Sequence, residues 1–328
     1  MSSTTSIQPG ASDPVDGGQS HATGTTAGKP GKERRVRRIP NTKKHRIDPM
    51  YYLFLVPTLV VFTLAITLPA VMGFLYSFTD SIGFGEFDVI GFTNYIAAFS
   101  DPAILASYGF TLGFSLVTVI VVNVISFLLA VGLTSRIRMK VALRAVFVIP
   151  MVVSGIIIAY VFQYLFSNSL PAFGQAIGFE PLATSILANP NLAWLSIVFV
   201  TAWQAMPMSM LIYIAGLLAI PAEVYEASSI DGASGWKQLW TITLPLVAGY
   251  VVINTIVSFK NFLNAYDIIV GLTNGGPGTA TRSIAMTIFS GFEGGDYAYQ
   301  MANATIFFII AVALALLQLR VTRGKAAL

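Results

Sequence analysis

Long apolar stretches without a charged residue recur along most of the chain. Beyond residue 48, six windows free of Asp, Glu, Lys and Arg exceed the ~18 residues that suggest a membrane span. They are 49–79, 102–135, 145–179, 181–222, 238–259 and 297–319. Soluble helices of that length would show a charged face, and the runs are continuous rather than alternating as in a membrane β-barrel. The pattern predicts an all-α membrane protein with six transmembrane helices.

The predicted spans also define an orientation. They lie near 51–78, 108–133, 143–167, 191–219, 245–271 and 301–320. Of the 19 Lys and Arg residues, 17 fall in the N-terminal tail, the 134–144 and 220–244 loops and the C-terminus, which six spans place on one side. Because Lys and Arg collect in cytoplasmic loops, this side is predicted to be cytoplasmic. We therefore expect a multi-pass membrane protein with both termini in the cytoplasm.

The domain organisation follows from the same pattern. Residues 1–48 are rich in Ser, Thr, Gly and Pro and then basic, which predicts a disordered cytoplasmic tail whose basic end contacts lipid headgroups. Residues 49–322 are predicted to form the six-helix transmembrane domain, with a cytoplasmic loop at 220–244. Residues 323–328 are predicted to be a short cytoplasmic C-terminus.

Composition excludes several classes of protein. Hydrophobic residues make up 55% of the chain and charged residues 10%, against roughly 25% charged in an ordinary soluble domain. The formal net charge of +4 comes from the tail, so a nucleic-acid partner is not expected. Cysteine is absent, and the two histidines, His21 and His45, lie in the tail. We therefore predict no metal site and no catalytic residue in the body, and the absence of a phosphate-binding loop predicts no ATP hydrolysis by this chain.

One predicted cytoplasmic loop, 220–244, differs from the usual short basic loops. Pro221 suits the first turn of a helix, and Glu223 and Glu226 lie in its early turns, where the helix dipole favours anions. Gly232 lets the chain turn before a second apolar helix. A short helix with apolar and acidic faces suits a groove on a partner protein, whereas a helix lying on lipid prefers Lys and Arg. The loop is predicted to be a helix, a turn and a helix that docks on a partner.

The same loop resembles a motif of the integral-membrane permeases of bacterial ABC importers. Their "EAA…G" coupling loop is similar to Glu226-Ala227-Ser228 followed by Ile230-Asp231-Gly232-Ala233, with Ser228 in place of the second alanine. In that family the loop enters a cleft of a separate ATPase, whose closure moves it and opens the path alternately to each side. The resemblance assigns ATPase coupling to Glu223, Glu226, Ala227, Asp231, Gly232 and Ala233.

Two further motifs resemble the carbohydrate-uptake branch of this family. Gly91-Phe92-Thr93-Asn94-Tyr95 resembles its G-x-x-N-Y element. The run from Asp267 to Pro277 resembles its D-x-I-x-x-L-T-x-G-G-P segment, with Tyr266 where the family has Phe. The resemblance covers roughly residues 50–320.

The resemblance implies the type I ABC importer permease (MetI-like) fold in the bacterial cytoplasmic (inner) membrane. It also implies a second, homologous permease, expected as a heterodimer, and a dimer of ATPase subunits that bind ATP and Mg. An extracytoplasmic solute-binding protein would deliver a sugar substrate. The chain itself would hold no cofactor and would form half of the translocation path.

Span five carries an unusual set of polar residues. Ionisable groups inside a span are costly and usually face protein or a water-filled path. Lys260, Asn264 and Asp267 stand at i, i+4 and i+7, which on one helix is one face, and Asn261 lies beside them. We predict that this stripe lines the path, with hydrogen bonding between helices as the alternative. Replacing Lys260 with Met should then impair uptake.

Span four and the loop after span five add candidates. Trp203 and Gln204 suit the flat faces and the hydroxyls of a sugar, although packing alone is the alternative. Gly275, Gly276 and Pro277 require a tight, non-helical backbone. The resemblance places this external loop near the docking surface of the binding protein, and a simple turn is the alternative.

The sequence leaves three alternative functions open. An ion-driven secondary transporter would use Lys260 and Asp267 for coupling, and substitution of Glu226 and Gly232 would barely affect it. An ABC permease for a non-sugar solute is the second. A membrane-embedded enzyme is the third, and the lack of His and Cys in the body makes a catalytic cluster hard to assemble.

Overall fold

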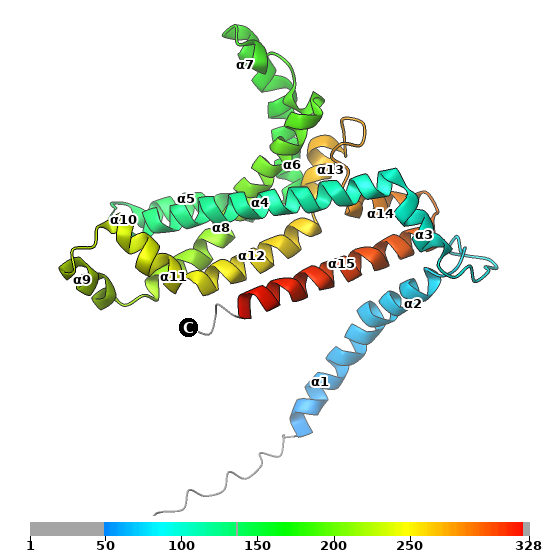
Figure 1. Cartoon of the computed structure of the whole chain (residues 1–328). Coiled ribbons are helices and arrows are strands. Elements are labelled where there is room, and N and C mark those ends of the chain that lie inside the picture. The colour runs from blue at the N-terminus through cyan, green and yellow to red at the C-terminus, as the bar shows by residue number, and fades with distance from the viewer. Residues whose placement is uncertain (1–48, 136, 324–328) are drawn as a thin grey trace, which may run out of the picture. The chain divides into compact units, whose positions relative to one another are not determined.

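The computed structural model describes residues 49–135 and 137–323 (Figure 1). The predicted disordered tail, residues 1–48, and the end of the predicted C-terminus, residues 324–328, lie outside the described residues. Contacts divide the chain into one unit that ends at Val56 and a second that begins at Pro57. The packing described below is that of the second unit.

The described elements are almost all helices. In chain order they are α1 Pro49–Phe62, α2 Leu68–Tyr76, α3 Thr93–Ser100, α4 Pro102–Thr134, α5 Lys140–Val152, α6 Gly155–Tyr164, α7 Leu170–Ala176, α8 Pro190–Leu218, α9 Ala222–Ile230, α10 Gly235–Gln238, α11 Leu244–Leu246, α12 Ala248–Leu263, α13 Asp267–Thr273, α14 Ile284–Glu293 and α15 Tyr297–Arg323. Single π-helical turns at Thr63–Thr67, Leu165–Ser169 and Leu239–Thr243 join consecutive helices, and 3-10 turns at Glu180–Leu182 and Ile186–Ala188 precede α8.

Five described helices are long and apolar enough to cross a membrane. They are Tyr52–Tyr76, Pro102–Thr134, Gly155–Ala176, Pro190–Leu218 and Tyr297–Arg320. A sixth span is the pair Gly235–Leu246 and Ala248–Leu263, which is bent by 64° at Val247. The predicted all-α architecture with six spans is therefore confirmed when the bent pair counts as one span.

The predicted bounds of span three, 143–167, are wrong. The helix stops at Val152, and Val153 and Ser154 take extended conformations with ψ of 138° before α6 begins at Gly155. Gln204 of α8 stabilises this break, because its Nε2 donates a hydrogen bond to the Val153 carbonyl at 3.0 Å. The long apolar span therefore runs from Gly155 to Ala176.

The predicted bounds of span five, 245–271, are also wrong. Helix α12 ends at Leu263, and α13 begins at Asp267 after a non-helical link. Within the link, the Asn264 side chain donates from Nδ2 to the Lys260 carbonyl at 2.9 Å. A side chain that competes for a backbone carbonyl favours the end of a helix, which gives the break a local cause.

The core of the second unit centres on α4 and α8, which make its most extensive helix–helix contact. One buried cluster joins Phe114 of α4 to Ile197 of α8, and another joins Ala130 of α4 to Met210 of α8. The N-terminal halves meet in the first cluster and the C-terminal halves in the second, so the two helices run parallel. Helix α12 packs on α4, and α5 packs on α8.

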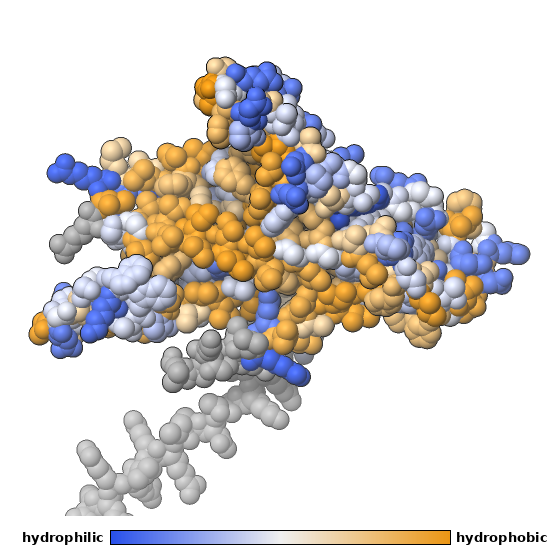
Figure 2. All heavy atoms as spheres, turned by 45° about the horizontal axis from the view of Figure 1, so that its top comes forward, coloured by the Kyte–Doolittle hydropathy of each residue, from blue (hydrophilic) through white to orange (hydrophobic). Residues whose placement is uncertain are grey.

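The surface explains why so many apolar residues remain exposed. Figure 2 shows hydrophobic residues in a continuous band across the long helices and hydrophilic residues gathered at the ends. Leu116 and Ile120 of α4 and Phe199 of α8 are among the exposed large side chains. A continuous apolar surface of this kind is stable against lipid or another membrane subunit, but not against water.

Helix α13 packs closely on α6, and Gly271 makes the contact possible. A Cβ atom at Gly271 would lie 2.5 Å from the Ala159 Cβ of α6. We expect Gly271→Ala to destabilise the chain by about 1–3 kcal/mol, because overpacking forces the helices apart. Melting temperature in detergent measures this. Gly109→Ala on α4 is the matched control, since no atom lies within 4 Å of its Cβ position. Equal melting temperatures would contradict the expectation.

Candidate transport site and coupling hairpin

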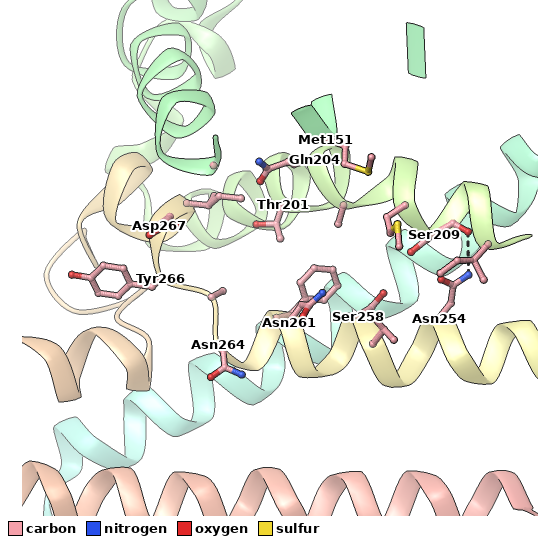
Figure 3. Close-up of a pocket in the computed structure, with 18 residues that line it drawn as sticks. Met151, Thr201, Gln204, Ser209, Asn254, Ser258, Asn261, Asn264, Tyr266 and Asp267 are labelled. Atoms are coloured by element: carbon pink, nitrogen blue, oxygen red, sulfur yellow. Dashed lines mark hydrogen bonds between the residues drawn. The ribbon is translucent and has the colours of Figure 1, made fainter. Parts of the chain in front are cut away.

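An open cavity of about 400 Å³ lies between α8, α12 and the link that leads into α13 (Figure 3). Met151, near the end of α5, also lines it. Its polar lining residues are Thr201, Gln204, Ser209, Asn254, Ser258, Asn261, Asn264, Tyr266 and Asp267. A polar cavity bordered by membrane-spanning helices is the expected place for a solute path.

Half of the residues that line this cavity are polar, and each of these except Asp267 carries an amide or a hydroxyl. Asp267 is the one charged group among its lining residues. Amide and hydroxyl groups both donate and accept hydrogen bonds without carrying charge. The lining therefore suits an uncharged ligand that offers many hydroxyl groups.

Some of these polar groups hold helices together, and others are free. Asn254 is buried, and its Nδ2 donates to the Ser209 carbonyl at 3.1 Å, which ties α12 to α8. Within the described part of the chain, the Asn261 amide and the Asp267 carboxylate have no hydrogen-bond partner, and both residues are exposed. The Thr201 hydroxyl is buried and also unpartnered there. Asn261 and Asp267 are thus the groups most available to a solute.

The predicted polar stripe of span five is wrong as a single helical face. Lys260 lies in the last turn of α12, Asn264 in the link and Asp267 at the start of α13. Lys260 is exposed and does not line the cavity, and no ion pair joins it to Asp267. Its predicted role in the path stays a prediction.

The helical face that does line the cavity is Asn254, Ser258 and Asn261. These residues also stand at i, i+4 and i+7, but the face they form begins six positions before the predicted stripe. The missed residues Ser209 and Thr201 lie on the facing side of α8. Small polar residues in an apolar span were the signal that could have found them.

Of the two residues predicted for span four, one lines the cavity and the other does not. Gln204 lines the cavity and also reaches the break between α5 and α6. Trp203 does not line the cavity, and its ring packs edge-on against Phe162 of α6 with centroids 5.3 Å apart. Its predicted contact with a sugar stays a prediction.

The predicted helix–turn–helix of the 220–244 loop is confirmed. Helix α9 ends at Ile230, Gly232 takes a φ of +76°, and Ser234 caps the start of α10. Glu223, Glu226, Ala227, Asp231 and Gly232 are exposed, and Ala233 is half-buried. We call residues 222–243 the coupling hairpin; its contact with an ATPase stays a prediction.

Side chains lock the two arms of the coupling hairpin together. Gln238 of α10 donates from Nε2 to the hydroxyls of Ser228 at 2.9 Å and Ser229 at 3.0 Å. The hydroxyls of Tyr225 and Thr243 lie 3.0 Å apart. Ser228, which departs from the family motif, is buried in this contact. These contacts hold the two arms of the hairpin together as one unit.

Removal of the Gln238 amide tests this rigidity. In Gln238→Leu we expect amide exchange in 222–232 to rise about fivefold, because a hydrogen bond of this kind contributes about 1 kcal/mol. Hydrogen–deuterium exchange measures the change. Thr241→Val is the matched control, since its hydroxyl bonds only to the Lys237 carbonyl of its own helix. Similar exchange in both variants would show that the arms are held by other contacts.

The loop after α13, which the sequence predicts to be external, has the predicted tight, non-helical backbone. Gly275 takes a φ of +83°, a conformation that favours glycine. The Thr281 hydroxyl closes the loop by donating to the Gly276 carbonyl at 2.6 Å. Pro277 follows within the closed loop, and the predicted proximity of these residues to a binding protein stays a prediction.

Apolar spans around a polar cavity, with a rigid exposed hairpin, define the class of membrane transport subunits. The sequence model for "Binding-protein-dependent transport system inner membrane component" matches residues 123–323. The chain belongs to this family. It is therefore a transport subunit rather than an enzyme, and a multi-pass protein of the inner membrane, as predicted.

Relatives and solved structures agree with this assignment. The "Multiple sugar-binding transport system permease protein MsmF" of Streptococcus mutans is 33% identical over 274 residues, covering 83% of this chain and 94% of its own. The "Trehalose/maltose transport system permease protein MalF" of Thermococcus litoralis is 32% identical over 286 residues, covering 86% and 96%. A bacterial ABC transporter involved in alginate import has a similar fold, with a TM-score of 0.73, 20% identity and coverage of 84% and 95%. The predicted resemblance to carbohydrate-uptake permeases and the predicted fold are confirmed.

Proposed function

We propose that this chain imports an uncharged sugar as one of two permeases in an ATP-driven ABC importer. Both termini lie in the cytoplasm. The chain forms half of the translocation path, and a second, homologous permease forms the other half. ATP and Mg bind to a dimer of partner ATPases, and an extracytoplasmic binding protein delivers the sugar.

The chemistry of the cavity is the observation that carries this proposal. The Asn261 amide has no partner among the described residues, and Gln204 adds an amide from the facing helix α8. A site whose polar groups hydrogen-bond to hydroxyls discriminates strongly against solutes that lack them. The relatives named for maltose, trehalose and multiple sugars support the same substrate class.

The coupling hairpin supports the ATP-driven mechanism over an ion-driven one. Its acidic residues Glu223, Glu226 and Asp231 are exposed, with Lys237 as its one basic residue, and the locked arms suit docking in a cleft. Alternating access then follows from rigid-body motion of the permeases when the ATPase dimer closes.

Isolation of the native complex tests the proposed function. The tagged chain is purified from its host in mild detergent, and bound proteins are identified by mass spectrometry. We expect an ATPase, a sister permease and a binding protein whose ligand names the sugar. Recovery of the folded chain alone, together with sugar uptake that needs an ion gradient and no ATP, would overturn the proposal.

A further inference from the structure

The segment between the first two spans forms a small external hairpin at residues 78–91. Thr79 and Val89 pair as an antiparallel bridge. The Asp80 amide donates to the Asp88 carbonyl at 3.1 Å, and the Asp88 amide donates to the Asp80 carboxylate at 2.7 Å. We call residues 78–91 the external hairpin.

Neighbouring elements brace the external hairpin. Asn94 of the G-x-x-N-Y element donates from Nδ2 to the carbonyls of Ser77 at 3.0 Å and Thr79 at 2.8 Å. The Ala298 amide of α15 donates to the Ser81 carbonyl at 3.2 Å. The hairpin is thus a fixed projection of the transmembrane domain.

The hairpin exposes large apolar side chains beyond the end of its span. Ile82 is 56% exposed, Phe84 76% and Val89 79%. Helix α4 begins near the external hairpin and ends near the coupling hairpin (Figure 1). Its 33 residues correspond to about 50 Å, so the external hairpin lies at the opposite face of the membrane. Apolar residues gathered at such a place indicate an interaction site.

The acidic residues around these apolar side chains indicate which kind of partner the surface would bind. Glu86 and Asp88 are exposed on the hairpin, and Glu293 and Asp296 are exposed beside the start of α15, which braces it. The one basic residue among the described external loops, Arg282, donates to the Ser290 hydroxyl. Carboxylates repel anionic lipid headgroups, so the surface favours a protein with a basic rim around an apolar patch.

We infer that the external hairpin is a docking surface for the basic face of the solute-binding protein. This inference rests on the proposed function. Phe84 and Val89 supply the apolar centre of the contact, and Glu86 and Asp88 supply its complementary charge. Electrostatic attraction of this kind raises the association rate and falls with salt.

Charge reversal in the intact importer tests the inference. The four-subunit complex in nanodiscs carries Glu86→Lys with Asp88→Lys, and ATPase stimulation is titrated with the sugar-loaded binding protein. We expect the half-saturating concentration to rise at least about tenfold and to lose its salt dependence, with the maximal rate unchanged. Glu180→Lys, another exposed external acid away from the hairpin, is the control and should shift it by less than about twofold. Equal half-saturation in wild type and charge reversal would overturn the inference.

A label on the hairpin tip separates docking on protein from insertion into lipid. The chain has no cysteine, so Phe84→Cys gives one site for an environment-sensitive fluorophore on this subunit. We expect water-exposed emission in nanodiscs and a blue shift when the binding protein is added. Blue-shifted emission before its addition would place the hairpin tip in lipid or against the second permease, and either result would overturn the inference. Failure of the wild-type complex to respond to any binding protein would instead reject the proposed function.

Discussion

Gly232→Val is expected to reduce ATP-driven sugar uptake at least about tenfold while the chain stays folded in the membrane. Gly232 forms the turn of the coupling hairpin with a φ of +76°, where a β-branched residue is strongly disfavoured. No atom lies within 4 Å of a Cβ at this position, so the effect comes from backbone strain and not from a clash. Relief of the strain is expected to move Glu226 and Asp231, so that the hairpin no longer fits the ATPase cleft proposed above. Uptake and sugar-stimulated ATP hydrolysis in proteoliposomes measure the loss.

Gly178→Val is the matched control for this experiment. Gly178 follows α7, takes a φ of +69° and also has no atom within 4 Å of its Cβ position. The two substitutions therefore impose similar strain, and we expect similar losses in melting temperature. Uptake should stay within about twofold of wild type in the control. Equal loss of uptake in both variants would mean that strain anywhere in the fold is enough, and would remove the case for a coupling role of the turn.

The architecture could be predicted because each membrane span is a continuous segment of the sequence with a recognisable composition. Charge-free windows mark spans through the cost of burying charge in lipid, and the asymmetry of Lys and Arg predicts their orientation. The coupling hairpin could also be predicted from the sequence, because Pro221 marks the start of its first helix and Gly232 marks its turn. Such signals depend on residues next to one another in the sequence and need no knowledge of packing.

The cavity was only partly predictable, because its walls depend on where helices stop. Apolar composition continues through Val153, so the hydropathy does not mark the break between α5 and α6. The charge-free window of span five does end at residue 259, close to the end of α12 at Leu263, but spacing alone places the polar residues beyond it on one continuous helical face. The breaks depend on hydrogen bonds, one from Gln204 to the Val153 carbonyl and one from Asn264 to the Lys260 carbonyl. The first joins residues 51 positions apart, and spacing along one helix cannot reveal it.

Asn261→Leu is expected to lower the rate of sugar uptake at least about tenfold, with unstimulated ATP hydrolysis and assembly unchanged. Asn261 lines the cavity with an amide that has no partner among the described residues, so no helix contact is lost. Leucine leaves a sugar hydroxyl unpaired in the path, which costs about 1–3 kcal/mol. Asn254→Leu distinguishes a structural effect, because it breaks the buried bond to the Ser209 carbonyl and should lower the melting temperature.

Lys260→Met is the decisive comparison for Asn261→Leu, since the two residues are neighbours on α12. The sequence stripe predicts impaired uptake for Lys260→Met, whereas the structure places this side chain outside the cavity wall. We therefore expect uptake within about twofold of wild type for Lys260→Met, because an exposed charge with no partner contributes little. A large loss with Lys260→Met and none with Asn261→Leu would restore the stripe predicted from the sequence and would move the translocation path away from the cavity between α8 and α12.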